Sequence, residues 1–223
     1  MRFATLGSGS AGNATLVVHE HTSILIDCGL SARELERRAV ALGFDIASLD
    51  AVLITHEHDD HVSGAATVAK RTGATVWATA GTAFAARERL ANVSQLEVIV
   101  PEQTLNIGTL EINPVIVPHD AREPCQFVIK AGEQRLGILT DVGQITVHLE
   151  RAYTALTGLV LEFNHDPQLL SRSPYPASLK RRIGGEYGHL SNDQAMDLLN
   201  KLDLSRLQHF VAAHLSQKSN SPE

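Results

Sequence analysis

The sequence predicts an α/β fold, a sandwich of two mixed β-sheets with helices on its outer faces. Short apolar runs rich in Val, Ile and Thr alternate with segments of helical periodicity along the chain, as expected for strands that alternate with helices. The first strand candidates follow one another closely enough to pair as antiparallel neighbours, whereas later ones are separated by helices and favour parallel pairing. Both kinds of pairing in one chain indicate mixed sheets.

Each expected strand is a short apolar run with β-branched residues. These runs are 2–6, 14–19, 23–27, 51–55, 75–79, 96–100, 110–117, 125–130, 135–140, 158–163 and 208–213. Ser31 and Ser191 precede two of the expected helices as N-caps, and Glu34 is expected to complete a capping box with Ser31. The expected helices are 31–43, 63–72, 81–91, 144–155 and 191–202.

Length and composition limit the possible functions. The 223 residues predict one domain over 1–223, and a net charge of −6 gives no general attraction to nucleic acid or to an anionic membrane. Aromatic residues make up 4% of the chain, which argues against an extended base-stacking platform. The segment 164–188 is rich in proline and arginine and is interpreted as an insertion or lid with local positive charge. A polyanionic partner would therefore have to meet a local patch.

Location is predicted from what the sequence does not contain. No apolar stretch approaches the roughly 20 residues of a transmembrane helix, so no membrane association is expected. The first residues lack the apolar segment of a signal peptide. Cys28 and Cys125 are too few for a disulfide framework, so a reducing cytoplasm is the expected location.

The glycines from Gly7 to Gly12 match the spacing of a dinucleotide-binding fingerprint. That fingerprint requires a helix next, whose N-terminus receives the pyrophosphate. Here Asn13 leads instead into the alternating strand pattern "ATLVVHEH". The sequence therefore favours a tight turn at the rim of an active site over a cofactor site.

The stretch "VLITHEHDDHVSG" at 52–64 carries the strongest chemical signal. Clustered imidazoles and carboxylates repel one another and lose solvation unless something compensates them. A divalent cation compensates, because neutral imidazole and ionised carboxylate are common metal ligands. Three further residues end apolar runs and can supply more ligands, although each alone also suits an ordinary turn: His119, Asp141 and His214.

On these residues the chain resembles the metallo-β-lactamase-fold hydrolases, whose His-x-His-x-Asp-His signature stands at 56–61. The resemblance implies an αββα sandwich that binds two divalent metal ions (Zn, Mn or Fe). It implies that one ion is held by His56, His58 and His119, that the second is held by Asp60, His61 and His214, and that Asp141 bridges both. Asp27 resembles the carboxylate that orients a ligand imidazole in this family.

A closer resemblance is to the YycJ- or WalJ-type exonuclease group, carried by the stretches "GSGSAGN", "LEFNHD", "SPYPASLKRRI", "GHLSN" and "AAHLSQKSNSPE". It implies a DNA exonuclease acting from the 5′ end through a metal-bridging hydroxide. Members of the group continue past the Ser-Pro-Glu segment, whereas this sequence stops nine residues after His214. That departure leaves C-terminal contacts and oligomeric state open, a homodimer being one alternative.

The remaining site residues are assigned with alternatives. The resemblance to ribonuclease Z implies that Glu162 and His189 relay a proton to the leaving oxygen, with a structural role as the alternative. Substrate contacts are expected from His165 and from the lid residues Lys180, Arg181 and Arg182. Two other functions stay open: a small-molecule ester or thioester hydrolase similar to glyoxalase II or the lactonases, and a metal-fold binding module without activity, which the full set of ligand types disfavours.

Overall fold

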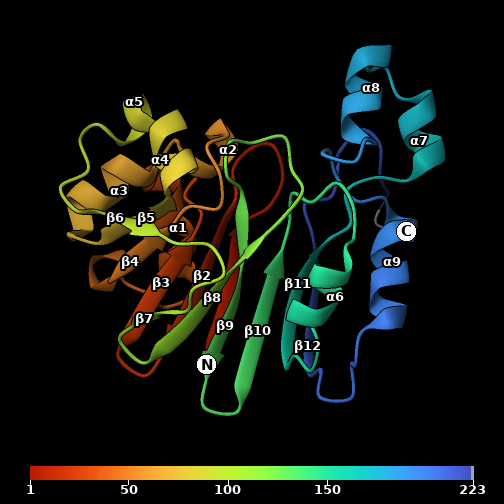
Figure 1. Ribbon diagram of the computed structural model, residues 1–223. Helices are drawn as coiled ribbons and strands as arrows, with labels where there is room; N and C mark the ends of the chain where they lie inside the picture. The colour runs from red at the N-terminus through yellow and green to blue at the C-terminus, as the bar shows by residue number, and fades with distance from the viewer. Residues whose placement is uncertain (222–223) are drawn as a thin grey trace. The chain divides into compact units, whose positions relative to one another are not determined.

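The computed structural model describes residues 1–221 and divides them into two compact units (Figure 1). Unit 1 comprises Met1–Pro114 and Ala121–Cys125, and unit 2 comprises Val115–Asp120 and the chain from Gln126 onward. The final two residues of the Ser-Pro-Glu stretch lie outside the described residues. The prediction of one domain over 1–223 stays a prediction.

Unit 1 contains a mixed sheet in which sequence order equals spatial order. The first three strands pair antiparallel, and the following pairs are parallel. The parallel register places Ile26 opposite Leu53, so β3 and β4 end at the same edge of the sheet. The strands are β1 (Arg2–Gly7), β2 (Ala14–His19), β3 (Thr22–Ile26), β4 (Ala51–Leu53), β5 (Thr75–Thr79) and β6 (Leu96–Ile99).

Helices cover this sheet through a shared apolar core. Leu35 of α1 and Val68 of α3 lie in one buried cluster with Leu25, Val52 and Val76 of the strands. Burial of such side chains stabilises each by about 1.5–3 kcal/mol. The helices of unit 1 are α1 (Ala32–Ala41), η1 (Ile46–Ser48), α2 (Asp59–Val62), α3 (Ala65–Thr72), α4 (Ala80–Ala85) and α5 (Arg87–Leu90).

The second sheet has the order β12-β11-β10-β9-β8-β7. β9 and β10 are antiparallel, whereas β10, β11 and β12 are parallel neighbours, so their carboxyl ends lie at one edge. The strands are β7 (Leu105–Ile107), β8 (Leu110–Ile116), β9 (Cys125–Ala131), β10 (Gln134–Leu139), β11 (Gly158–Glu162) and β12 (His209–Ala213).

The core of unit 2 lies between its strands and two of its helices. Tyr153 is fully buried there and donates a hydrogen bond of 2.7 Å to the carbonyl of Ile138. Leu149 and Leu198, from α6 and α9, pack in the same cluster as Leu159. The helices of unit 2 are α6 (Val147–Ala152), α7 (Pro167–Arg172), α8 (Ala177–Ile183) and α9 (Asn192–Lys201).

The predicted fold class is confirmed, since two mixed sheets flanked by helices are present. Every expected strand is found within one or two residues of its predicted ends. The expected helix 81–91 is divided at Ala86 into α4 and α5, and the short elements β7, α2, α7 and α8 were not predicted. Among residues 1–221, no helix combines the length and apolarity needed to cross a membrane.

The capping predictions were half right. Ser31 accepts a hydrogen bond from the Glu34 backbone, as expected of an N-cap. The Glu34 carboxylate, however, accepts hydrogen bonds from Arg37 and Arg38, which compete for it with the backbone of the cap. A complete capping box forms at Ser191, the other predicted N-cap.

Candidate metal centre

The histidine-rich loop of unit 1 begins at the carboxyl end of β4. Because β3 and β4 are parallel neighbours, Asp27, which follows β3, lies beside Thr55 and His56, which follow β4. The loop then enters α2, whose first turn contains Asp60 and His61. Unit 1 therefore presents four of the predicted metal ligands on one continuous segment.

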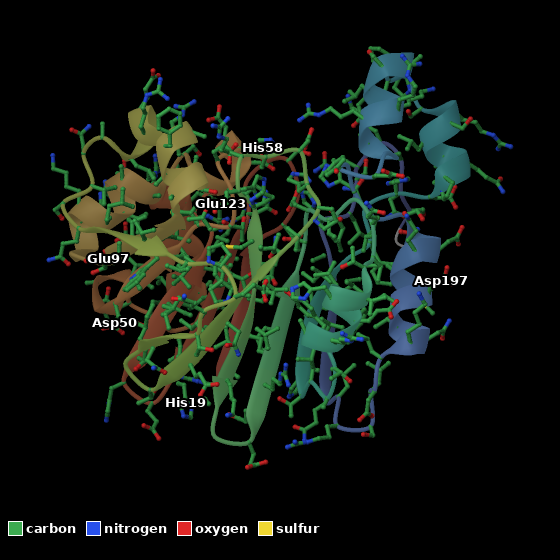
Figure 2. The ribbon with its side chains drawn as sticks, viewed as in Figure 1. His19, Asp50, His58, Glu97, Glu123 and Asp197 are labelled. Carbon is green, nitrogen blue, oxygen red and sulfur yellow. The ribbon has the colours of Figure 1, made fainter. Side chains whose placement is uncertain are left out.

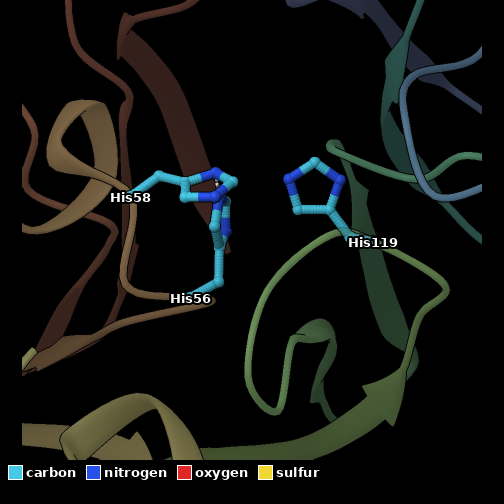
Figure 3. A group of neighbouring side chains, drawn as sticks. All are labelled: His56, His58 and His119. Carbon is cyan, nitrogen blue, oxygen red and sulfur yellow. Dashed lines mark hydrogen bonds between the residues drawn. The ribbon is translucent and has the colours of Figure 1, made fainter. Parts of the chain in front are cut away.

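The imidazoles of this loop face one another. His56 Nε2 and His58 Nδ1 are 3.0 Å apart, and their ring centroids are separated by 4.5 Å in an edge-on arrangement (Figure 3). The ring centroids of His56 and His61 are 4.1 Å apart, and both side chains are buried. Buried imidazoles with converging ring nitrogens are the arrangement that a divalent cation requires.

The Asp27 carboxylate anchors the histidine-rich loop through hydrogen bonds. Its carboxylate accepts hydrogen bonds from the Thr55 backbone and hydroxyl at 2.9 Å, and it lies 2.8 Å from His61 Nδ1. The Thr55 hydroxyl also lies 2.9 Å from His56 Nδ1. These contacts leave Nε2 of both imidazoles as the nitrogen that would face an ion. Burial raises the pKa of Asp27, although His61 and Thr55 act in the opposite direction.

Asn13 was not predicted as a site residue, yet it lies against the loop. Its backbone amide donates to the Asp60 carbonyl at 2.7 Å, and its side-chain nitrogen lies 3.2 Å from Asp60 Oδ2 and 2.9 Å from His61 Nε2. Its side-chain oxygen accepts from Gly9, which closes the glycine turn. The predicted tight turn is present, closed by a hydrogen bond from the Gly12 amide to the Gly9 carbonyl, and its place at the rim of an active site stays a prediction.

Close backbone packing completes this arrangement. A Cβ atom on Gly29 would come within 1.7 Å of the Asp60 carbonyl oxygen. Only glycine allows the chain after β3 to approach the ligand loop this closely. Cys28, the preceding residue, is a buried thiol whose pKa burial raises to about 12.

Unit 2 gathers its candidate ligands from separate strand ends. Asp141 follows β10, Glu162 ends β11 and His214 follows β12, so the parallel strands deliver all three to one edge. His189 precedes α9 and joins them. Ligand atoms of these four residues lie within 4.8 Å of one another.

Glu162 is the central acceptor of this group. Its Oε1 lies 2.9 Å from His189 Nδ1 and 2.8 Å from His214 Nδ1, and its Oε2 accepts from the backbone amides of Val142 and Leu190. Burial opposes ionisation of Glu162, but the two imidazoles outweigh it and lower the pKa of the carboxyl. The pKa of His189 is raised to about 9, because Glu162 and Asp141 outweigh the effect of burial.

His119 comes from the loop after β8 and is drawn in Figure 3. It is buried, and its Nδ1 donates to the Gly188 carbonyl at 3.1 Å. That hydrogen bond fixes the tautomer in which Nε2 carries the lone pair, as a metal ligand requires. The neighbouring Asp120 pairs with Arg182 of the lid.

The predicted lid contains two short helices, α7 and α8, and is not a structureless insertion. Lys180 donates to the Ser171 carbonyl at 2.6 Å and joins the two helices, whereas Arg181 is exposed. His165, at the start of the lid segment, has 3% of its surface exposed, and burial lowers its pKa. Its predicted contact with substrate stays a prediction.

The donor sets fit a divalent metal in both units. Each consists of buried or half-buried imidazoles and carboxylates, with a further buried carboxylate, Asp27 or Glu162, bonded to imidazole Nδ1. Carboxylate-bonded imidazoles are typical of metal-bound histidine. The two thiols of the chain, Cys28 and Cys125, are buried and are absent from the candidate metal-binding groups among the described residues.

Comparison with known proteins identifies the class. The family model of the β-lactamase superfamily domain matches residues 22–214, and the chain belongs to that superfamily. The fold agrees: a metallo-β-lactamase fold protein from Bacillus subtilis, YhfI, superposes with a TM-score of 0.73 over 96% of this chain and 86% of its own, at 16% identity.

Curated relatives match over the whole chain. Exodeoxyribonuclease YycJ of Bacillus anthracis is 29% identical over 225 residues, which cover 100% of this chain and 85% of the relative. Exodeoxyribonuclease WalJ of Streptococcus pneumoniae is 29% identical over 226 residues and is covered to 84%. The superfamily and these relatives identify the chain as a metal-dependent hydrolase.

Proposed function

We propose that this hydrolase is a dinuclear phosphodiesterase that degrades DNA from the 5′ end. The observation that carries the proposal is the pairing of Glu162 with His189 beside Asp141, in a chain similar over its full length to two proteins named as exodeoxyribonucleases. Phosphodiester cleavage needs an acid for the leaving oxygen, and this pair provides one.

The proposed ligand sets are those that the family resemblance implies. His56, His58 and His119, the three side chains in Figure 3, would hold one ion. Asp60, His61 and His214 would hold a second ion, and the Asp141 carboxylate would serve as a ligand shared by both. The set offers nitrogen and oxygen donors, which suit zinc, manganese or iron.

The chain's own residues orient these ligands. Bound ions would supply Lewis acidity and a hydroxide nucleophile near neutral pH. Asp27 fixes the ring of His61 through Nδ1, and Glu162 fixes the ring of His214 in the same way. Removal of such a partner typically weakens metal binding 10- to 100-fold, so both carboxylates belong to the proposed site.

His189 is the proposed general acid. Its raised pKa keeps the ring protonated near neutral pH, and its side chain is 22% exposed, so a substrate can reach it. When the phosphodiester bond breaks, His189 gives its proton to the departing oxygen and Glu162 stabilises the imidazolium before and after the transfer. Such acid catalysis contributes typically 10²–10⁴-fold.

The lid supplies proposed contacts to the DNA backbone. Arg181 is exposed on α8, and Arg182 is held by Asp120 beside His119. Lys180 is anchored on α7, so it fixes the lid and adds positive charge. His165, at the start of the lid segment, is proposed as a substrate contact together with Lys180, Arg181 and Arg182.

The first test is digestion of DNA labelled separately at its 5′ and 3′ ends, with manganese or zinc. Wild type should release nucleotides from the 5′ end, and Asp60→Ala should lose activity by at least about 10³-fold. Asp197→Ala, an exposed carboxylate on α9 (Figure 2), is the matched control and should match wild type. Wild type that leaves every labelled DNA intact but turns over a thioester would instead establish the ester or thioester hydrolase.

A further inference from the structure

Unit 1 carries an exposed aromatic ring among arginines, here called the aromatic–arginine patch: Phe84, Arg87, Arg89 and Arg122. Phe84 is 63% exposed at the end of α4. The guanidinium carbon of Arg87 lies 5.2 Å from the ring centroid, and that of Arg122 lies 5.9 Å from it. Both distances fall in the range of attractive cation–π contacts.

Two contacts join this patch to the ligand loop. Arg89 of α5 pairs with the Asp59 carboxylate, with Nη2 2.8 Å from Oδ1 and 2.9 Å from Oδ2. The Arg122 backbone amide donates to Glu57 Oε1 at 2.7 Å. Glu57 and Asp59 alternate along the chain with the proposed ligands, so the patch borders the metal loop. Figure 1 shows α2, α4 and α5 at the same end of unit 1.

The loop that carries Arg122 is itself held firmly against α4. The next residue, Glu123, accepts the Gly81 amide at 2.6 Å through Oε2, and its carbonyl accepts from the Thr79 and Thr82 hydroxyls. Glu123 and His58, both labelled in Figure 2, lie towards the same end of unit 1. Arg122 is therefore presented to solvent from an ordered backbone.

The composition of the patch points to its ligand. The exposed Phe84 ring gains little free energy from burial, and the exposed guanidiniums of Arg87 and Arg122 beside that ring offer two positive groups to an anion. A nucleotide offers both missing partners, since a base stacks on an aromatic ring or a guanidinium plane and a phosphate pairs with arginine.

We infer that the aromatic–arginine patch binds single-stranded DNA beside the metal centre, with one base stacked on Phe84 and adjacent phosphates paired with Arg87 and Arg122. This inference rests on the proposed function and adds a binding surface that the lid does not supply. One aromatic ring suffices for such a contact, although the low aromatic content excludes an extended platform. Arg89 is not a proposed DNA contact, and it positions the histidine-rich loop through its ion pair with Asp59.

The test is steady-state digestion of a single-stranded oligonucleotide by the manganese-loaded full chain. Phe84→Ala should raise KM about tenfold and leave kcat within about twofold, and Phe84→Tyr should restore KM. An oligonucleotide with abasic sites should abolish the difference between wild type and Phe84→Ala. Arg87→Ala with Arg122→Ala should lower the slope of log affinity against log salt by about 1.4, which is two phosphates at about 0.7 each.

Matched controls come from exposed residues outside the patch. Val147→Ala on α6, whose side chain is 61% exposed, and Arg71→Ala on α3 should behave as wild type. If wild type digests DNA and all patch variants match it in KM and salt slope, the patch has another occupant, such as a protein, and the inference is wrong. If wild type itself digests no DNA, the proposed function is wrong and the inference is wrong with it. That result differs from the previous one, in which wild type digests DNA and only the patch has no effect.

Discussion

Asp27 in unit 1 and Glu162 in unit 2 are two buried carboxylates that both contact imidazole Nδ1 atoms but have opposite pKa shifts. Each lies at the carboxyl end of a strand and bonds an imidazole of the proposed metal site through Nδ1. Burial dominates at Asp27 and raises its pKa, whereas two imidazoles together lower the pKa of Glu162.

The difference lies in the number and charge of the donors. Glu162 meets two imidazoles and two backbone amides, whereas Asp27 meets one imidazole and a threonine. A carboxylate that accepts several hydrogen bonds from charged or backbone donors stays ionised despite burial. Glu162 is therefore suited to proton transfer with His189, and Asp27 to holding a ligand ring.

The largest expected effect separates these roles. Glu162→Gln should lower kcat for DNA digestion by about 10²–10⁴-fold, because His189 loses the carboxylate that keeps it protonated. End-labelled digestion over a range of substrate concentrations measures kcat. Glu150→Gln, which changes a carboxylate paired with Lys201 on the surface of unit 2, is the control. A Glu162→Gln variant with unchanged kcat would contradict the relay.

Asp27→Asn should act on metal binding instead. Loss of the charged partner of His61 is expected to weaken metal affinity about 10- to 100-fold, measured by competition with a chelator of known affinity. Asp50→Asn changes a carboxylate that accepts hydrogen bonds from the Ser23 amide and hydroxyl, and this variant should bind metal as wild type does. Equal affinities for Asp27→Asn and wild type would remove Asp27 from the site.

The pH dependence of stability tests the pKa difference in chelator-treated protein. The pKa of His189 is raised to about 9 from an ordinary 6.5, so its stabilisation is complete below pH 6.5 and is lost as the pH rises through 9. We expect a loss of about 2 kcal/mol in the free energy of unfolding across that interval. Urea unfolding at pH 6 and pH 9 measures it.

Two variants sharpen this measurement. Glu162→Gln should flatten the pH dependence, because the raised pKa of His189 depends on that carboxylate. Asp27→Asn should keep the dependence, because the His189–Glu162 pair remains. A wild type as stable at pH 9 as at pH 6 would show that the pair does not stabilise the fold.

The smallest expected effect concerns Asn13. Asn13→Ala removes the side-chain hydrogen bonds to Gly9 and Asp60, which should cost about 1 kcal/mol. Thermal unfolding measures the change, and Asn106→Ala on β7 is the control, since that asparagine is exposed. Equal melting temperatures for Asn13→Ala and wild type would contradict a supporting role for this side chain.

The two ligand sets differ in how far the sequence predicts them. The unit 1 set lies within the six residues from His56 to His61, so its spacing alone indicates a metal site. The unit 2 set comes from three parallel strand ends and the loop before α9, and the family resemblance is what predicts Asp141 and His214 as ligands. The roles of Asn13 and Thr55 were not predicted, because their contacts to Asp60 and Asp27 join segments that are far apart in the sequence.

The short elements were missed for a related reason. β7 has three residues and α2 has four, which is too few for periodicity to show. The aromatic–arginine patch gathers residues from α4, α5 and the 121–125 segment, and contacts such as the hydrogen bond from the Gly81 amide to Glu123 bring that segment to α4. Patterns within one segment predict elements, whereas contacts between segments require the fold.

Three proposed site residues adopt left-handed backbone conformations: Asp27 at φ 61°, Asp141 at φ 52° and His214 at φ 56°. Such conformations cost about 1–3 kcal/mol for residues other than glycine. Glycine would relieve that cost at each position and remove the functional side chain. Selection of a mutant library for heat resistance alone should therefore enrich glycine at these positions and yield more stable, inactive proteins, so any such selection must also require catalysis.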